Sequence, residues 1–364
     1  MKQNINVLVA MSGGIDSSVA AFLLKKLGYQ VHGIYFQLIN DKNYKGKKNL
    51  GQEAHGSYSG SQRVQEIAEK LNIPFRIIDY RKEFKETIID DFISKYQNGI
   101  TPNPCIICNE KVKFNLLFEY AKNNDMQLIS TGHYVQTEKS VNGDEYLLRR
   151  GLDIKKDQSY FLYRLNQKIL SRSIFPLGKQ TKRNTEKIAR EIGLIPFRIK
   201  ESQEICFIYG NNYRQLIETK QGKGTKSGYF LDTSGNILGK HKGIAFYTIG
   251  QRRKIGLSLN TRKYIVRLNF KDNTIIIGDE EDLYQKECKL EKVHYISPKP
   301  ISQPTRLQVQ IRYNSFPSSA TVIPDREDEL RVFFDEPQRA ITPGQSAVLY
   351  TDDFVVGGGI ISNF

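Results

Sequence analysis

The sequence contains few cysteines, 4 in 364 residues. So small a number excludes the dense disulfide framework of small secreted domains. Long apolar runs are also missing, because no stretch approaches the roughly 18 apolar residues of a membrane-spanning helix. The N-terminus leads into a strand-like run instead of the apolar core of a signal peptide. We therefore expect a cytoplasmic protein that does not use a membrane.

Acidic residues are fewer than basic ones, 39 against 54, and the net charge is +15. Such an excess favours a polyanionic partner, with nucleic acid as the first candidate. Basic segments that would contact phosphates lie at 149–156, 178–187 and 250–256. Each of them alone is typical of a solvated surface, so it is their sum with the overall charge that favours RNA.

Strand and helix patterns alternate in the first part of the chain. Strand-like runs occur at 5–10, 31–36, 75–79 and 128–131, and helical spacing occurs at 17–28, 61–71 and 182–194. This alternation predicts an α/β domain with a parallel sheet, whose ligands bind beyond the carboxyl ends of the strands. The polar segment 40–60 reads as a surface loop.

Helical character fades after about residue 210, and the length of the chain calls for two or three domains. Residues 263–278 read as a β-hairpin, and 306–313 alternate strictly, with Leu307, Val309, Ile311 and Tyr313 on one face. We expect an α/β domain at 1–210, a small central domain at 211–280, and a β-barrel or sandwich at 281–364.

The stretch SGGIDSS, residues 12–18, joins the first strand to the first helix. No lysine follows its glycines, so the P-loop pattern of ordinary NTPases is absent. Backbone N–H groups, hydroxyls and the helix dipole would converge on one anion here. Asp16 would orient Mg²⁺ or the loop itself. A plain structural turn is the alternative interpretation.

Two cysteines lie in TPNPCIICN, residues 101–109, after two prolines. The pattern predicts a helix after Cys108, whose positive end would lower the pKa of this thiol. Cys206 lies in SQEICF near the domain boundary, whereas Cys288 has no unusual context. A single CxxC supplies only two of the four ligands of a structural zinc site, which makes zinc the weaker interpretation.

The loop resembles that of the PP-loop ATP pyrophosphatases, which adenylate a carbonyl oxygen and release pyrophosphate. Some members of that superfamily deliver ammonia and others deliver sulfur to RNA. Sulfur delivery requires thiol chemistry, because a thiolate is a strong nucleophile and can carry a second sulfur as a persulfide. The cysteines therefore favour thiolation over amidation.

Taken in order, the whole chain resembles the MnmA family of tRNA-specific 2-thiouridylases, enzymes that are tRNA-uridine 2-sulfurtransferases. The motifs that carry this resemblance are SGGIDSS, TPNPCIICN, TGHY at 131–134, KDQSYFLY at 156–163, SQEICF at 202–207, GQRRKIGL at 250–257, RY at 312–313 and PGQ at 343–345. The resemblance implies a PP-loop parallel-sheet domain like that of adenine nucleotide alpha hydrolases, a small central domain and a C-terminal β-barrel. It further implies 2-thiolation of the wobble uridine in tRNAs for Lys, Glu and Gln, with ATP and Mg²⁺ and with sulfur from a persulfide carrier protein or sulfide.

The resemblance also assigns residues. The ATP site would be formed by Ala10, Met11, Ser12, Gly13, Gly14, Ile15, Asp16, Ser17, Phe36 and Gly132. The tRNA or its target base would contact Asn103, Pro104, Cys105, His133, Lys156, Asp157, Gln158, Arg312, Tyr313 and Gln345. Cys108 matches the family nucleophile, and Cys206 matches the cysteine that receives sulfur as a persulfide. Taken alone, His133 is more typical of a structural histidine, and the aromatic cluster Tyr160, Phe161 and Tyr163 is more typical of a core.

Cys105 departs from the commoner family pattern, which has an aspartate there as the acid/base group. Two mechanisms follow. Either the Cys206 persulfide delivers sulfur and Cys108 resolves it to a disulfide bond, or Cys105, Cys108 and Cys206 ligate a [4Fe–4S] cluster that carries the sulfide. An ammonia-incorporating ligase and an RNA-binding module with a degenerate nucleotide loop are the rival functions.

Overall fold

A computed structural model describes residues 4–40, 60–194, 205–208, 213–220, 222–258, 261–297 and 299–362. Most of the polar loop expected at 40–60 lies outside these residues, as do the first residues of the SQEICF motif. The chain divides into two compact units. The first contains Met1–Thr87, Ile106–Gln203 and Asp353–Val355, and the second contains Ile88–Cys105, Glu204–Asp352 and Val356–Phe364. Among the described residues, no helix is long and apolar enough to cross a membrane.

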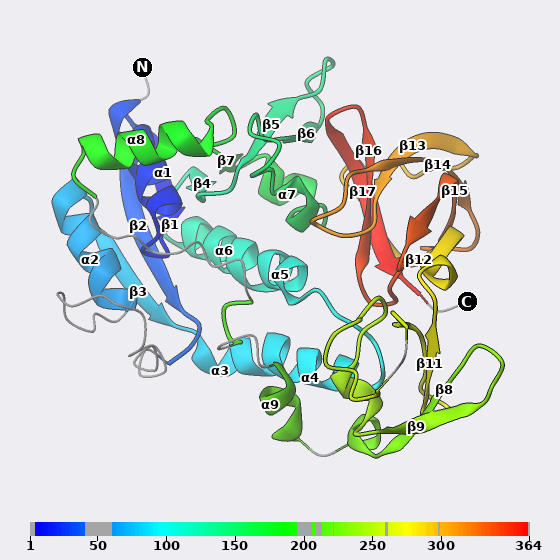
Figure 1. The fold of residues 1–364 in the computed structure, drawn as a ribbon. Coiled ribbons are helices and arrows are strands. Elements are labelled where there is room, and N and C mark those ends of the chain that lie inside the picture. The colour runs from blue at the N-terminus through cyan, green and yellow to red at the C-terminus, as the bar shows by residue number, and fades with distance from the viewer. Residues whose placement is uncertain are drawn as a thin grey trace. The chain divides into compact units, whose positions relative to one another are not determined.

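The first unit is built on a five-stranded parallel sheet (Figure 1). Its strand order is β3-β2-β1-β4-β7, and each neighbouring pair runs parallel. The strands are β1 (Asn6–Ala10), β2 (Gln30–Gln37), β3 (Phe75–Asp79), β4 (Leu128–Ser130) and β7 (Ser173–Ile174). The first four confirm the runs expected from the sequence. Order and direction match a doubly wound fold, whose ligands bind where the strands end.

Three helices share one hydrophobic core with β1 and β2. They are α1 (Ile15–Lys26), α2 (Gly60–Leu71) and α8 (Lys182–Glu191). In α2 the buried residues are Val64, Ile67, Ala68 and Leu71, which recur with the helical spacing expected at 61–71. After α1 the chain turns at Gly28, whose φ of +86° is strained for any residue with a Cβ. The helical spacing of all three segments is therefore confirmed, with α1 beginning two residues earlier than expected.

The segment 81–123 is helical over most of its length. It contains α3 (Arg81–Phe84), a π-helix (Lys85–Ile89), α4 (Asp90–Gln97), α5 (Pro104–Ile107), a second π-helix (Cys108–Phe114) and α6 (Asn115–Asn123). Helix α6 packs against β1 and β4. Within this segment, Ile88–Cys105 belongs to the second unit. The first unit also contains the hairpin β5 (Val135–Lys139) and β6 (Tyr146–Arg150), a 3-10 turn (Ser159–Phe161) and α7 (Gln167–Leu170).

The second unit contains a small four-stranded sheet in the order β10-β11-β8-β9. Its strands are β8 (Gly228–Leu231), β9 (Ile237–His241), β10 (Tyr264–Asn269) and β11 (Thr274–Gly278). Strands β10 and β11 form the hairpin expected at 263–278, and Asn273 in its turn has a φ of +51°. Helix α9 (Tyr213–Glu218) contributes Ile217 to the core of this sheet, and 3-10 turns lie at Lys223–Thr225, Ile244–Phe246 and Glu281–Leu283.

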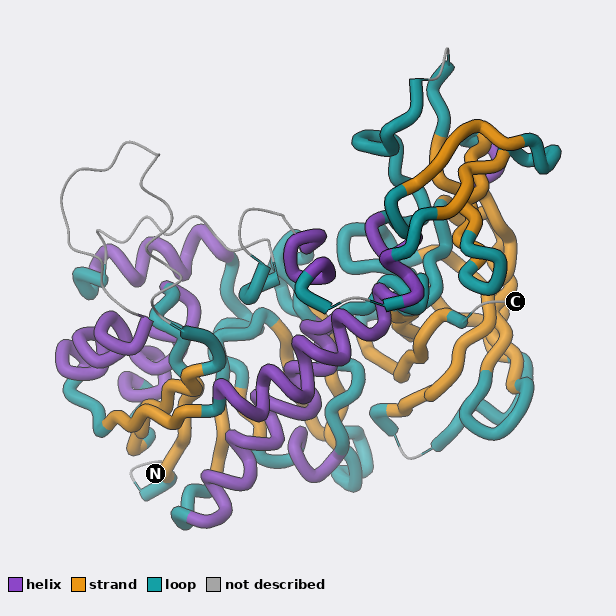
Figure 2. The backbone as a smooth tube through the Cα atoms, turned by 90° about the horizontal axis from the view of Figure 1, so that it is seen from below, coloured by secondary structure: helices purple, strands orange, loops and turns teal. Residues whose placement is uncertain are grey.

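Six antiparallel strands of the second unit close into a barrel, because β12 pairs with both β15 and β17. They are β12 (Tyr284–Tyr295), β13 (Thr305–Gln310), β14 (Ser318–Pro324), β15 (Leu330–Arg339), β16 (Ser346–Thr351) and β17 (Phe354–Ile361), and they lie together near the C-terminus in Figure 2. Leu307 and Val309 point into the barrel core as expected. Strand β13 ends at Gln310, however, so Tyr313 lies beyond it.

Candidate functional site

The loop of residues 11–14 leaves the carboxyl edge of the parallel sheet directly after β1. Strand β4 ends at Ser130, and the TGHY segment at 131–134 follows it. Because β1 and β4 pair in parallel, the two segments leave the sheet at the same edge. Both motifs therefore lie beyond the carboxyl ends of the strands, where ligands of a parallel sheet are expected to bind.

Serine hydroxyls shape the loop from within. Ser17 Oγ accepts a hydrogen bond from Ser12 N at 3.1 Å and donates to Gly14 O at 3.2 Å. Ser18 Oγ also donates to Gly14 O, at 2.9 Å. The first N–H groups of a helix have no acceptor within the helix. In α1 the first backbone hydrogen bond of the helix runs from Ser18 N to Gly14 O. The preceding N–H groups, at the positive end of the helix, suit an anionic ligand.

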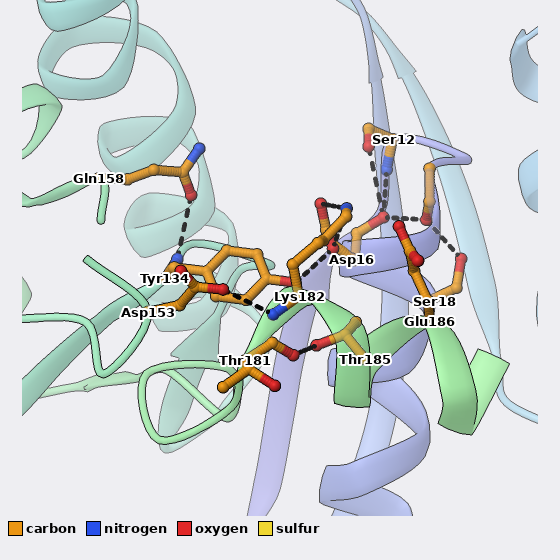
Figure 3. Close-up of polar contacts among 12 residues, drawn as sticks. Ser12, Asp16, Ser18, Tyr134, Asp153, Gln158, Thr181, Lys182, Thr185 and Glu186 are labelled. Atoms are coloured by element: carbon orange, nitrogen blue, oxygen red, sulfur yellow. Dashed lines mark hydrogen bonds and ion pairs between the residues drawn. The ribbon is translucent and has the colours of Figure 1, made fainter. Parts of the chain in front are cut away.

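Asp16 is held by two donors from other elements (Figure 3). Lys182 Nζ, at the start of α8, lies 2.8 and 2.9 Å from the two carboxylate oxygens, and Tyr134 OH donates to Oδ1 at 2.7 Å. These contacts join the start of α1 to the start of α8 and to the turn after β4. The sequence pattern places Lys182 only in a basic segment expected to bind RNA, because nothing in that segment links this lysine to a loop 166 residues away.

Gly132 lies directly against the backbone of the loop. A Cβ built on it would lie 2.6 Å from Ser17 N and 2.8 Å from the carbonyl carbon of Asp16. Only glycine therefore allows the turn after β4 to approach the start of α1 so closely. Of the other residues expected at the nucleotide, Met11 and Phe36 are buried, whereas Ala10 and Ile15 are partly exposed.

His133 is partly buried and bonded within its own turn. Its Nδ1 lies 2.7 Å from Thr131 Oγ1, and its ring packs against Phe114 with centroids 5.8 Å apart. Burial, and then the nearby positive charge of Lys113, lower its pKa to about 3. The imidazole is therefore neutral near pH 7 in the protein without RNA.

We expect His133 to remain neutral from pH 8 down to pH 5. In an NMR titration of the histidine ring protons, one signal should stay constant across this range and should be missing from the His133→Asn spectrum. Because the pKa is lower in the folded than in the unfolded protein, His133 costs no stability above about pH 6.5 and lowers it as the pH falls from there toward 3. A midpoint between pH 6 and 7 for that signal would contradict the assignment.

Within the second unit, the TPN and PGQ motifs are bonded to each other. Thr101 N donates to Pro343 O at 3.1 Å, and Gln345 Nε2 donates to Thr101 O at 2.9 Å and to Pro102 O at 3.3 Å. A Cβ on Gly344 would lie 2.8 Å from Thr101 O. Gln345 thus fixes the backbone that leads to Asn103, Pro104 and Cys105.

The cysteines differ in exposure: Cys206 is exposed, Cys105 is partly buried, and Cys108 and Cys288 are buried. The helix expected to begin after Cys108 begins instead at Pro104, where a proline is favoured at the first helical position. Cys108 therefore lies inside the helical segment, and the helix-end argument for a lowered thiol pKa does not apply to it. Burial and nearby Glu287 raise the pKa of Cys288 to about 12, which makes it an inert core residue.

The π-helix that begins at Cys108 is fastened to the segment after the KDQ motif. Arg164 Nε and Nη2 bond Glu110 at 2.7 and 3.2 Å in a largely buried, two-point contact, and Asn109 Nδ2 donates to Phe161 O at 3.4 Å. Such π-turns are frequent at functional sites. Cys206 is anchored differently, because its neighbour Phe207 packs edge-on against Phe92 of α4.

Two of the three KDQ residues serve the local fold. Asp157 is buried and accepts from Gly151 N, Ser159 N and Ser159 Oγ at 2.7–3.1 Å, while Gln158 Oε1 accepts from Tyr134 N at 3.0 Å. Burial raises the pKa of Asp157, although these hydrogen bonds oppose the shift. Lys156 is partly exposed. Tyr160 and Tyr163 are fully buried, as the core interpretation predicted.

Arg312 and Tyr313 lie in the loop that follows β13. Gln310 Nε2 bonds the carbonyl oxygens of Arg312, Tyr313 and Ser315 at 2.9–3.2 Å, and Arg312 Nη2 donates to Arg339 O. Both residues are partly exposed. In the described part of the chain, no three His, Cys, Asp or Glu side chains gather in a way that would hold a metal ion.

Three family models match the chain in order. The model described as the tRNA methyl transferase HUP domain covers residues 5–210, the tRNA methyl transferase PRC-barrel domain covers 219–279, and the aminomethyltransferase beta-barrel domain covers 285–361. These models agree with a parallel-sheet domain, a small central domain and a closed β-barrel.

Curated relatives match over nearly the full length. A tRNA-specific 2-thiouridylase MnmA from Clostridioides difficile (strain 630) is 43% identical and covers 99% of both chains. Proteins of the same name from Halothermothrix orenii and Acetivibrio thermocellus are 43% and 41% identical and cover 98% of each chain.

Proposed function

Since the chain belongs to the MnmA family of tRNA-specific 2-thiouridylases, we propose that it carries out the ATP-dependent 2-thiolation of the wobble uridine of tRNA. The observation that carries this proposal is the agreement in length and order with relatives of that name. The descriptions of two family models name a tRNA methyl transferase. The phosphate-binding loop and the cysteines at 105, 108 and 206 fit thiolation better than methylation.

The nucleotide site of the proposal is the loop at 10–17 with Phe36 and Gly132. Its N–H groups at the start of α1 fit a phosphate group, and the close packing of Gly132 on Ser17 holds this helix start in place. We propose that Mg²⁺ is held mainly by ATP oxygens, while Asp16 keeps its hydrogen bond from Tyr134 OH. ATP supplies the activating adenylyl group.

In the proposed first step, O2 of the uridine attacks the α-phosphorus of ATP and pyrophosphate leaves. An amide-like carbonyl is otherwise a poor electrophile, whereas AMP is a good leaving group. The base must be extruded from its stack to react, which the anticodon loop permits at a cost of a few kcal/mol. Asn103, Pro104 and Cys105 would face the target base, on a backbone that Gln345 holds in place.

In the proposed second step, the terminal sulfur of a Cys206 persulfide attacks C2 and AMP leaves with the former O2. Cys108 thiolate then attacks Cys206 Sγ, which leaves sulfur on C2 and forms a Cys108–Cys206 disulfide. The exposure of Cys206 suits sulfur delivery by a carrier protein, and the burial of Cys108 suits a resolving thiol. We write this step without a metal, and the alternative is the route in which Cys105, Cys108 and Cys206 ligate an iron–sulfur cluster.

We propose that the tRNA contacts seven residues of the chain. Where a side chain is already hydrogen-bonded within the protein, the backbone of its turn would make the contact. These residues are His133, Lys156, Asp157, Gln158, Arg312, Tyr313 and Gln345. A further basic surface lies in the second unit, where a cavity of about 1010 Å³ is lined by Arg214, Lys226, Lys242 and Tyr247 among others. Such side chains suit RNA phosphates and bases. We further propose that the domain boundaries lie near residues 210 and 280 and that the protein is cytoplasmic.

Unmodified tRNA for Lys, Glu or Gln, incubated with the protein, ATP and a sulfur donor, tests the proposal. Nucleoside mass spectrometry should detect 2-thiouridine together with one AMP for each thiolation. An ammonia-incorporating ligase would release AMP without 2-thiouridine, and an RNA-binding module would release no AMP. Iron content close to zero in active, anaerobically purified protein would support the persulfide route, and roughly four irons per chain would overturn it.

A further inference from the structure

The phosphate loop carries no basic side chain of its own, because residues 10–18 include neither lysine nor arginine. Cationic side chains reach it from other elements: Arg63 of α2 packs beside Gly13, and Lys182 of α8 bonds to Asp16. Lys182 Nζ bonds both carboxylate oxygens of Asp16, which lies in the first turn of α1. An ammonium group therefore stands at the same helix end as the N–H groups suited to phosphate.

Lys182 is held in position both at its backbone and at its ammonium group (Figure 3). Helix α8 begins at Lys182, where Thr181 Oγ1 accepts from Asn184 N at 3.2 Å and Lys182 N donates to Asp153 Oδ2 at 2.9 Å. The ammonium also lies 6.0 Å from the centre of the Tyr134 ring. The side chain is only 13% exposed, so little ordering remains to be done when a ligand arrives.

We infer that Lys182 is the cation of the phosphate loop and bonds the phosphate groups of ATP that leave as pyrophosphate. Without nucleotide, Asp16 compensates its charge. A bound triphosphate brings more negative charge than one carboxylate, and the low exposure of the ammonium strengthens that attraction. Tyr134 OH continues to hold Asp16 when Lys182 turns to the phosphates. Charge that develops on the departing pyrophosphate is then stabilised by a group already in place.

This inference rests on the proposed use of ATP, and binding measurements without tRNA separate the two. Calorimetric titration with ATP, with pyrophosphate and with adenosine would be carried out on the full-length protein. Lys182→Met should weaken ATP and pyrophosphate binding by about tenfold to a hundredfold, as for the loss of a charge-assisted hydrogen bond, and leave adenosine binding unchanged. Lys182→Arg should recover part of the loss.

The matched control is Lys187→Met on the same helix, whose side chain is 73% exposed and forms an ion pair with Glu191. It should bind ATP as the wild type does. Failure of the wild-type protein to bind ATP would overturn the proposed function itself. If Lys182→Met bound ATP with the affinity of the wild type, only the present inference would be overturned.

A purely structural role, in which Lys182 acts only through Asp16, makes a different prediction. In an Asp16→Asn background, Lys182→Met should still cost about tenfold in ATP affinity if the ammonium contacts phosphate. No further loss in the double variant would overturn the inference. The double variant also removes both charges, so it does not leave the Asp16 carboxylate without its cation, as Lys182→Met alone does.

Discussion

Alanine at Cys108 or at Cys206 is expected to reduce 2-thiouridine formation by a factor on the order of a thousand or more, since each thiol makes or breaks a bond to sulfur in the proposed route. Binding of ATP and of tRNA should remain, because neither thiol supports the phosphate loop. The measurement is nucleoside mass spectrometry under single-turnover conditions, together with titrations of both ligands.

The matched control is Cys288→Ala, since Cys288 is buried in the barrel and its thiol is protonated at neutral pH. It should keep its thiolation rate. Full activity in Cys108→Ala or Cys206→Ala would contradict sulfur transfer through these residues and would favour an ammonia-type ligase. Cys105→Ala separates the two sulfur routes, because a three-cysteine cluster requires Cys105 as strictly as Cys108, whereas the persulfide route does not.

Alanine at Gly132 is expected to destroy most nucleotide binding. Its Cβ would lie 2.6 Å from Ser17 N, and the neighbours are backbone atoms that have no rotamer to change. Either the turn after β4 or the start of α1 must shift, which separates the N–H groups from their common target. We expect ATP affinity to fall by about a hundredfold and the free energy of unfolding to fall by about 1–3 kcal/mol.

Gly28→Ala is the control, and it tests whether replacing another glycine near α1 also lowers ATP affinity. Gly28 has a φ of +86° and open space around its Cβ position at the other end of the helix. Alanine there should cost about 1 kcal/mol in backbone strain and leave ATP affinity unchanged. Equal losses of ATP affinity in both variants would show that general destabilisation, and not the contact at Ser17, is responsible. Calorimetric titration and thermal unfolding provide both readouts.

The sequence predicts the elements of the first unit well where one face of a segment is buried. In α2 the period of Val64, Ile67, Ala68 and Leu71 specifies both the helix and its buried side. Prediction fails where distant residues decide the outcome. Strand β13 ends at Gln310 because the side-chain amide of this residue bonds three carbonyl groups of the following loop. The alternation of apolar and polar residues cannot predict such a strand end.

The candidate site shows the same division. The loop at 12–18 and Gly132 carry local signals, since a glycine turn before a helix and a short segment after a strand are visible in the sequence. Lys182 carries none, because its partner Asp16 is 166 residues away and a lysine in a basic segment resembles any surface lysine. Asp157 is similar: its burial and its three donors depend on a turn that closes on Gly151 and Ser159.

The central claim is that ATP activates O2 of the uridine so that sulfur can replace it at C2. A tRNA that carries ¹⁸O at C2 of the wobble uridine tests this claim most directly. The account predicts that one ¹⁸O appears in AMP for each 2-thiouridine formed. Thiolated product with unlabelled AMP, and with the label released as water, would contradict it.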